Sequence, residues 1–118
     1  MHRRQLVPRV VVWAWVPFDD GPDGKWRMAV VVAPPTDDSV RVVPLTTLRA
    51  HSTTNTTAIE HWQEIGASRP LGARFRVVTI DPRLCSKIEG VLATDDWCRV
   101  ADIAARLGTG PFSTDNLA

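Results

Sequence analysis

The chain has 118 residues, of which 44% are apolar and 23% charged, and its formal net charge is +1. This composition is typical of one globular domain, and it excludes a global field that would attract nucleic acid or membrane to the whole surface. A membrane span needs about 18 consecutive apolar residues, which are absent, and the two cysteines are too few for a disulfide scaffold. We therefore predict a single cytoplasmic domain over residues 1–118, with loose tails at 1–9 and 109–118.

The first half of the chain predicts three closely spaced strands joined by short polar turns. Residues 10–16 form the first strand, with the even-numbered residues on one face and Val11, Trp13 and Trp15 on the other. The second strand covers 26–33, and its apolar run from position 28 predicts burial on both faces. The third covers 40–45, where Pro44 predicts an edge or a bulge. Such spacing is typical of a small antiparallel barrel or sandwich.

The second half predicts further strands and one helix. Residues 58–65 fit neither period well and favour a strand over a short helix, 73–80 predict one strand that ends at Asp81-Pro82, and 85–92 predict a last short strand. The helix covers about 94–107, with Thr94 as its N-cap and two aspartates in the first turn. Its apolar stripe comprises Trp97, Val100, Ala101, Ala104 and Leu107, and Gly108 ends it.

Several enzyme signatures are absent from the sequence. There is no P-loop, no dinucleotide-binding glycine motif and no nucleophile elbow. The three histidines form no zinc-type cluster, and the acidic pairs at 19–20, 37–38 and 95–96 fall in turns or a helix cap, where solvation or capping is the usual role. Cys98, near the helix start, could have a lowered pKa, but a buried structural thiol is the favoured interpretation. We expect no metal and no cofactor.

The remaining pattern combines an arginine with hydroxyl groups. Arg27 opens the second predicted strand, and Thr46 and Thr47 follow the third. If these strands form a hairpin, the arginine and the threonines meet at one end of the sheet, where they would suit a phosphate group. Between positions 41 and 76 the chain is locally basic, as expected for a single-stranded RNA groove, although arginines can also decorate exposed strand faces. The charged residues of this stretch are Arg41, Arg49, Arg69, Arg74 and Arg76 against Glu60 and Glu64.

Four segments, in this order, resemble the MazF/PemK group of toxin endoribonucleases. They are Val11-Val12-Trp13-Ala14-Trp15-Val16, Arg27-Met28-Ala29-Val30-Val31-Val32, Arg41-Val42-Val43-Pro44-Leu45-Thr46-Thr47 and Arg76-Val77-Val78-Thr79-Ile80-Asp81-Pro82-Arg83-Leu84, within residues 8–108. The sequence departs from the group's pattern at Pro8-Arg9, where Gly-Asp is usual, and at Met28, where a proline is usual. It also departs around Ala73-Arg74-Phe75.

The resemblance implies a mainly β fold, an SH3-like barrel with a C-terminal helix. It also implies a homodimer, an acidic antitoxin partner and metal-independent cleavage of single-stranded RNA. By this resemblance Arg27 and Thr46 are catalytic. We assign RNA contacts to Thr47, Arg49, His51, Arg74 and Arg76. Three alternatives stay open: a non-catalytic SH3-like binding module, a gyrase-poisoning toxin of the same fold without the arginine–threonine pair, and a nuclease based on His51 or His61.

Overall fold

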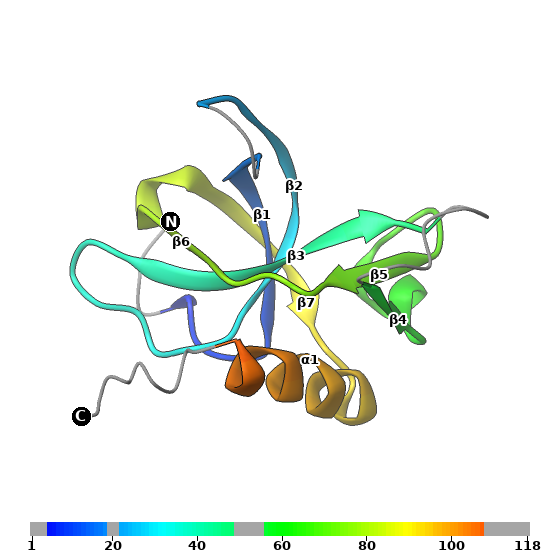
Figure 1. Ribbon diagram of the computed structural model, residues 1–118. Coiled ribbons are helices and arrows are strands. Elements are labelled where there is room, and N and C mark those ends of the chain that lie inside the picture. Colours follow the sequence, from blue (N-terminus) through cyan, green and yellow to red (C-terminus); the bar gives the residue numbers. More distant parts are fainter. Residues whose placement is uncertain (1–4, 19–21, 49–55, 108–118) are drawn as a thin grey trace.

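The computed structural model describes residues 5–18, 22–48 and 56–107, and the other residues lie outside this description. The described chain is mainly β and ends in one α-helix, as predicted (Figure 1). Within it, no helix combines the length and the apolar character needed to cross a membrane. In chain order the elements are β1 (Val10–Pro17), β2 (Gly24–Val31), β3 (Val40–Thr47), β4 (Thr56–Ile59), the 3-10 helix η2 (Trp62–Ile65), β5 (Leu71–Arg74), β6 (Val78–Ile80), the 3-10 helix η3 (Pro82–Leu84), β7 (Cys85–Val91) and α1 (Thr94–Arg106).

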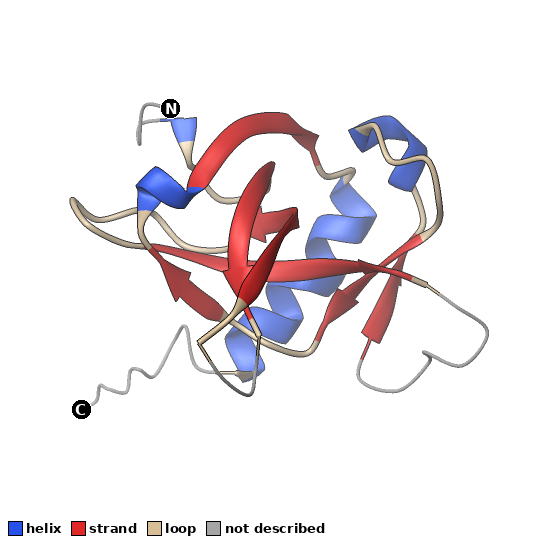
Figure 2. Ribbon diagram, turned by 90° about the horizontal axis from the view of Figure 1, so that it is seen from above, coloured by secondary structure: helices blue, strands red, loops and turns tan. Residues whose placement is uncertain are grey.

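The strands form one antiparallel sheet in the order β4-β5-β3-β2-β1-β7. The remaining strand, β6, also pairs with β3. The sheet curves around itself, and α1 lies across one side of it (Figures 1 and 2). β3 is its central strand: one edge pairs with β2, and the other pairs first with β6 through residues 40–42 and then with β5 through 45–47. The small antiparallel barrel with a C-terminal helix is therefore confirmed.

Pro44 does not lie in an edge strand, so of the two predicted alternatives, an edge or a bulge, the edge is wrong. It lies inside β3, opposite Ala29 of β2. On the other edge of β3, residues 43 and 44 fall between the part paired with β6 and the part paired with β5. A residue without an N–H can therefore occupy this position, because the ladder is already interrupted there.

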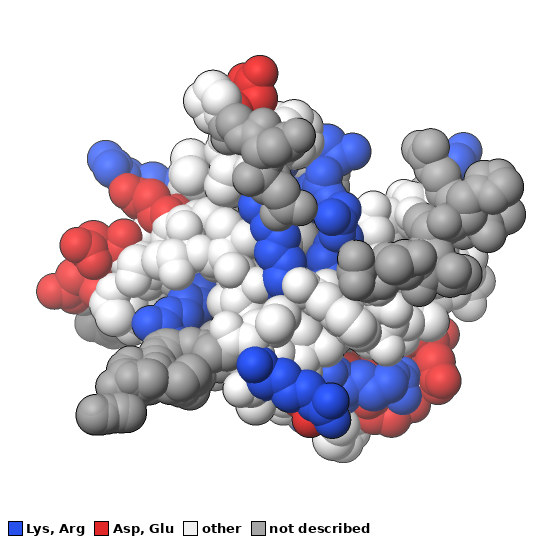
Figure 3. Space-filling view, in the orientation of Figure 1, with Lys and Arg blue, Asp and Glu red and all other residues white. Residues whose placement is uncertain are grey.

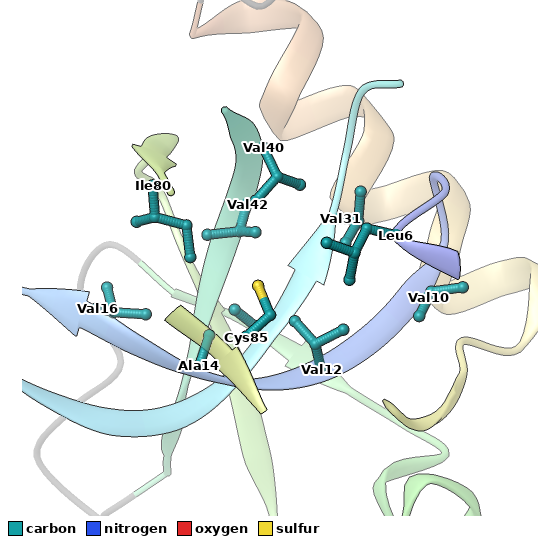
Figure 4. Close-up of a cluster of buried hydrophobic side chains, with 11 residues drawn as sticks. Leu6, Val10, Val12, Ala14, Val16, Val31, Val40, Val42, Ile80 and Cys85 are labelled. Carbon is teal, nitrogen blue, oxygen red and sulfur yellow. The ribbon is translucent and has the colours of Figure 1, made fainter. Parts of the chain in front are cut away.

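One face of the curved sheet encloses the first apolar cluster (Figure 4). The even-numbered residues of β1 all point into it and are buried, as the two-residue period predicts. β2, β3 and β6 contribute the other walls, and burial of each aliphatic side chain is worth about 1.5–3 kcal/mol. The cluster comprises Leu6, Val10, Val12, Ala14, Val16, Ala29, Val31, Val40, Val42, Ile80 and Cys85.

The opposite face of the sheet packs against α1 and η2. Val11, Val30 and Val43 come from the central strands, and Val100 and Ile103 come from the helix. The predicted helical stripe is rotated relative to the observed one: Ile103 is buried, whereas Leu107 is 47% exposed. Both faces of the central strands are covered where adjacent residues are valine, as at 10–12 of β1, 30–31 of β2 and 42–43 of β3.

Residues 73–80 form two strands, where the sequence predicted one. β5 ends at Arg74, β6 begins at Val78, and Phe75 between them is half exposed. Each of the two short strands pairs with a different part of β3, so the connecting residues leave the ladder. In the 58–65 region the predicted strand is correct only as far as Ile59, after which η2 forms and ends at Gly66, whose φ of 82° favours glycine.

The lead-in to β1 is not a loose tail over its described part. Leu6 is fully buried in the first cluster. Arg9 has a φ of 84°, unusual for a residue with a side chain, and several hydrogen bonds hold it there. Its backbone N–H donates to the Val31 carbonyl at 2.9 Å, and its side chain donates to the Leu92 carbonyl at 2.7 Å and to Thr94 Oγ1 at 3.0 Å. Arg9 thereby connects β1 to β2 and to the start of α1. Residues 1–4, Gly108 and the predicted tail 109–118 lie outside the described residues.

The start of α1 also differs from the prediction. Ala93 occupies the N-cap position, and Thr94 is the first helical residue. Asp96 is neither solvated nor a simple cap, because it is 0% exposed. Its carboxylate accepts hydrogen bonds from the backbone N–H groups of Glu60 at 2.8 Å and His61 at 2.9 Å, and from the guanidinium of Arg99. This carboxylate holds the helix against the turn after β4.

The two cysteines have opposite environments. Cys85 is buried, and its burial raises the pKa of the thiol to about 11. Cys98 is exposed on α1, so the interpretation as a buried thiol is wrong for this residue.

We expect Asp96→Ala to destabilise the fold by about 3 kcal/mol, because it removes the buried carboxylate that accepts from the backbone N–H groups of Glu60 and His61 and from Arg99. Urea unfolding followed by circular dichroism measures the change. Asp102→Ala is the matched control, since Asp102 is exposed on the same helix and pairs only with Arg106 in a surface ion pair. Equal midpoints for the two variants would contradict the role given to Asp96.

We also expect iodoacetamide at pH 8 to modify Cys98 in the folded protein and Cys85 only after unfolding, because the thiolate is the reactive form. Peptide mass spectrometry before and after addition of guanidinium identifies the modified residue. Equal modification of both thiols in the folded protein would contradict the burial of Cys85.

Candidate functional site: a cationic cleft between diverging strands

The candidate site lies where β2 and β3 separate. Their last paired residues at this end are Ala29 and Pro44, and continuing the register by two residues would set Arg27 opposite Thr46. No pairing with β2 continues there, and β3 is paired from this point on only along its other edge, with Thr46 opposite Gly72 of β5. Figure 1 shows the result: β2 continues with β1 in one direction, and β3 runs with β5 and β4 in another. A space therefore opens between the part of β2 that contains Arg27 and the part of β3 that contains Thr46.

This space is a cleft of about 350 Å³, which we call the Arg27 cleft. Its volume is within the range of small-ligand sites. β2 and β3 supply most of the wall, and β1 and β5 supply one residue each. The lining residues are Trp13, Lys25, Trp26, Arg27, Met28, Leu45, Thr46, Thr47 and Leu71.

Packing with β1 supports the projecting start of β2. β2 begins at Gly24, where a Cβ would collide with the carbonyl oxygen of Val16, so glycine permits the close approach of the two strands. Two residues further, Trp26 lies opposite Trp15, and their rings meet edge to face with centroids 6.1 Å apart. Such a pair contributes about 0.5–1.5 kcal/mol beyond its buried area. The prediction that this strand is buried on both faces from Met28 onward holds only from Ala29, because Met28 itself is partly exposed.

The Arg27 side chain is partly enclosed by the protein. The residue is half-buried, and its Nε atom is fully buried. The side chain therefore lies along the wall of the cleft, and its orientation is restricted before any ligand binds. Restricted orientation matters for a guanidinium, because its donors form a planar fork that must match the acceptor geometry.

The electrostatic character of the Arg27 cleft is uniformly positive. Its ionisable lining residues are Lys25 and Arg27, and no carboxylate or imidazole of the described residues lines it. Figure 3 shows lysine and arginine side chains gathered at the centre of the displayed face, with acidic side chains toward its edges. A partly enclosed cleft with one sign of charge attracts anions strongly even on a nearly neutral protein.

The structure brings some of the predicted site residues together and leaves others apart. Thr47 lines the cleft with Arg27 and Thr46. Arg74 and Arg76 do not line it, and the Arg76 guanidinium donates to the Pro17 carbonyl at 2.7 Å, which ties the segment after β5 to the β1–β2 hairpin. Arg49 and His51 lie outside the described residues, so their assignment stays a prediction.

Sequence reasoning missed three polar or aromatic members of the cleft. Lys25, Trp13 and Trp26 line it alongside the predicted residues. Trp26 is 42% exposed, which is unusual for the largest side chain in a small domain. The sequence did contain a sign that Trp26 is exposed: it lies between two charged residues, Lys25 and Arg27, at the start of the strand, where burial is incomplete.

A second cluster surrounds His61, away from the cleft. Its Nε2 lies 3.1 Å from Asp95 Oδ2 and its Nδ1 lies 3.2 Å from Glu64 Oε2. The hydrogen bond to Asp95 raises the pKa of His61 and lowers that of Asp95. Glu60, His61 and Asp95 offer ligand atoms within 4.8 Å of one another, so among the described residues they are the set that could hold a metal ion. All three are partly or fully exposed, and His61 does not line the Arg27 cleft.

Comparison with known proteins gives no relative that would assign this site. No family model matches the chain, and no curated protein matches it significantly. The resemblance to the MazF/PemK group therefore consists of the order of short motifs alone.

For His61 we expect a pKa above the usual value of about 6.5 and its return toward that value in Asp95→Asn. Since folding raises the pKa of His61, its imidazolium stabilises the fold fully at pH values below the pKa of the unfolded state. This stabilisation is lost as the pH rises through the His61 pKa of the folded state. The contribution of Asp95 has the opposite sign, because its pKa is lowered: it is present above the unfolded value and is lost as the pH falls through the folded one. Imidazole proton shifts recorded by NMR against pH measure the His61 pKa, with His61→Gln to assign the signal. An unchanged pKa in Asp95→Asn would contradict the contact.

Proposed function

We propose that this protein is an endoribonuclease that cleaves single-stranded RNA, and that it acts as the toxin of a type II toxin–antitoxin system. One observation carries the proposal: Arg27 from β2 and Thr46 from β3 line a single cleft. A permanently charged guanidinium beside a hydroxyl donor suits a phosphodiester. The order of motifs that resembles the MazF/PemK group supports the same assignment.

In the proposed reaction the 2′-hydroxyl of a ribose attacks the adjacent phosphorus atom. The P–O2′ bond forms while the P–O5′ bond breaks, and the products are a 2′,3′-cyclic phosphate and a 5′-hydroxyl end. The 2′-hydroxyl loses a proton, and the departing 5′-oxygen gains one. Negative charge accumulates on the non-bridging oxygens in the pentavalent transition state, so donors directed at them lower the barrier.

Arg27 and Thr46 have distinct roles in this scheme. A guanidinium keeps its proton at neutral pH, which favours stabilisation of the phosphorane by Arg27 over removal of a proton. Thr46 donates a hydrogen bond to a phosphoryl oxygen. Thr47 and Lys25 line the same cleft and supply further donors for the RNA backbone. The reaction as proposed uses no metal and no cofactor.

The same resemblance suggests the biological partners. We propose a cytoplasmic homodimer that is neutralised by an acidic, partly disordered antitoxin. The uniformly cationic cleft supports such a partner, because carboxylates on a flexible chain could occupy the sites of the RNA phosphates.

A non-catalytic nucleic-acid-binding module is the second candidate. One observation favours it: no described histidine, aspartate or glutamate lines the cleft, so none of these usual acid–base groups is placed to exchange the two protons. A gyrase-poisoning toxin is less well supported, because that branch lacks the arginine–threonine pair. A nuclease based on His61 is also less well supported, because His61 lies outside the cleft.

We expect Arg27→Ala to lower the rate of RNA cleavage at least about 100-fold, as the loss of one transition-state donor does in other enzymes. Thr46→Val should have a smaller effect in the same direction. Cleavage of a fluorescent single-stranded RNA is measured by gel, and mass spectrometry identifies the cyclic phosphate end.

Arg106→Ala is the matched control, because Arg106 is exposed on α1 and does not line the cleft. Circular dichroism establishes that each variant is folded. Full activity of folded Arg27→Ala would disprove the assignment. Tight RNA binding without any cleavage by the unmodified protein would select the binding module.

A further inference from the structure

A second pocket adjoins the Arg27 cleft. It has a volume of about 200 Å³ and shares three lining residues with the cleft, namely Met28, Thr47 and Leu71. Its other lining residues are Gly66, Ala67, Ser68 and Arg69, and we call it the Arg69 pocket. Because the two hollows share three lining residues, they adjoin each other, and we call the pair the groove; its second part lies beside the turn after η2.

The far wall of the groove is firmly positioned. The N–H of Ala67 donates to the Trp62 carbonyl at 3.3 Å, and Leu48 N–H donates to the Pro70 carbonyl at 2.9 Å. Arg69 therefore lies on a short exposed segment that is anchored on one side to η2 and on the other to the end of β3. Its backbone is fixed while its charged side chain faces solvent.

The lining of the groove is aromatic and cationic in the Arg27 cleft, mostly apolar where the two hollows adjoin, and polar and cationic in the Arg69 pocket. Trp13, Trp26 and Lys25 lie in the Arg27 cleft only, Met28, Thr47 and Leu71 form the shared wall, and Ser68 and Arg69 lie in the Arg69 pocket only. Aromatic rings suit the stacking of unpaired bases, and separated cations suit successive phosphates. Neither pocket is lined by a described carboxylate, so no described lining residue repels an anionic chain.

We propose that the Arg69 pocket is a nucleotide subsite, in which Arg69 binds the phosphate next to the one held by Arg27. The RNA then crosses the groove with a base stacked at the Trp26 end and its following nucleotide beside Thr47, Ser68 and Arg69. This inference rests on the proposed function for the identity of the ligand, but it concerns binding beyond the reacting phosphate. Arg69 is a positioning residue, because it does not contact the reacting atoms.

The test measures binding separately from cleavage. The probes are fluorescein-labelled 2′-O-methyl oligoribonucleotides, which lack the attacking hydroxyl, of two and six nucleotides. We expect Arg69→Ala to weaken binding of the hexanucleotide about tenfold, the loss typical of one charged contact, and to leave the dinucleotide unaffected. The dependence of log affinity on log salt should become shallower by about 0.7, the value for one phosphate on a single strand. Arg83→Ala is the control, because Arg83 is exposed and lines neither pocket.

Cleavage of unmodified RNA is measured in parallel. We expect Arg69→Ala to raise KM for the hexanucleotide while kcat is unchanged. Unaltered hexanucleotide affinity and salt dependence in Arg69→Ala would overturn the subsite, even if the protein cleaves RNA. Loss of hexanucleotide binding in Arg69→Ala without cleavage by the unmodified protein would support the subsite and reject the nuclease. Tighter binding of poly-glutamate than of either oligonucleotide would overturn the inference in favour of an acidic protein ligand.

Discussion

The candidate site depends on a single constraint, the point at which β2 and β3 stop pairing while β3 remains paired along its other edge. Up to Ala29 and Pro44 the strand pairs with β2, and beyond Pro44 it pairs with β5. Beyond this point β3 stays paired with β5 along its other edge and diverges from β2, so β2 loses its neighbour while β1 still supports it. The Trp15–Trp26 contact and the close approach at Gly24 keep this projecting hairpin ordered. The space between the diverging parts of β2 and β3 is the Arg27 cleft.

Both ends of the described chain are fixed by polar side chains that act over long sequence separations. Arg9 connects the entry to β1 with Leu92 and Thr94, and Asp96 connects α1 with the backbone of Glu60 and His61. Each residue alone would destabilise the fold, because Arg9 has an unfavourable φ and the Asp96 carboxylate is buried. Their hydrogen bonds offset that cost and set the position of α1 relative to the sheet. The same docking brings Asp95 to His61.

The chemistry of the cleft follows from which groups line it and which do not. Two cations and two threonine hydroxyls face a space that is bounded otherwise by aromatic and aliphatic side chains. Such a surface has the combination of charge for phosphates and aromatic rings for bases that the proposed single-stranded RNA ligand would require. Because no described carboxylate or imidazole lines the cleft, catalysis there would depend on stabilisation of the transition-state charge. The Arg69 pocket extends the same chemistry by one nucleotide.

The sequence by itself determined the mainly β class, the faces of β1, the extent of α1 within a residue or two, and the placement of Arg27 and Thr46 at the same end of neighbouring strands. These features depend on side-chain period, on local caps and turns, and on a hairpin between successive strands, all of which are visible within short windows. Only the tertiary structure decided that 73–80 is two strands, that Asp96 is buried, that Arg76 binds Pro17, and that Lys25, Trp26 and Arg69 lie along one groove. Each of these depends on which part of β3 pairs with which distant strand, and that choice is made by the packing of the whole sheet against α1.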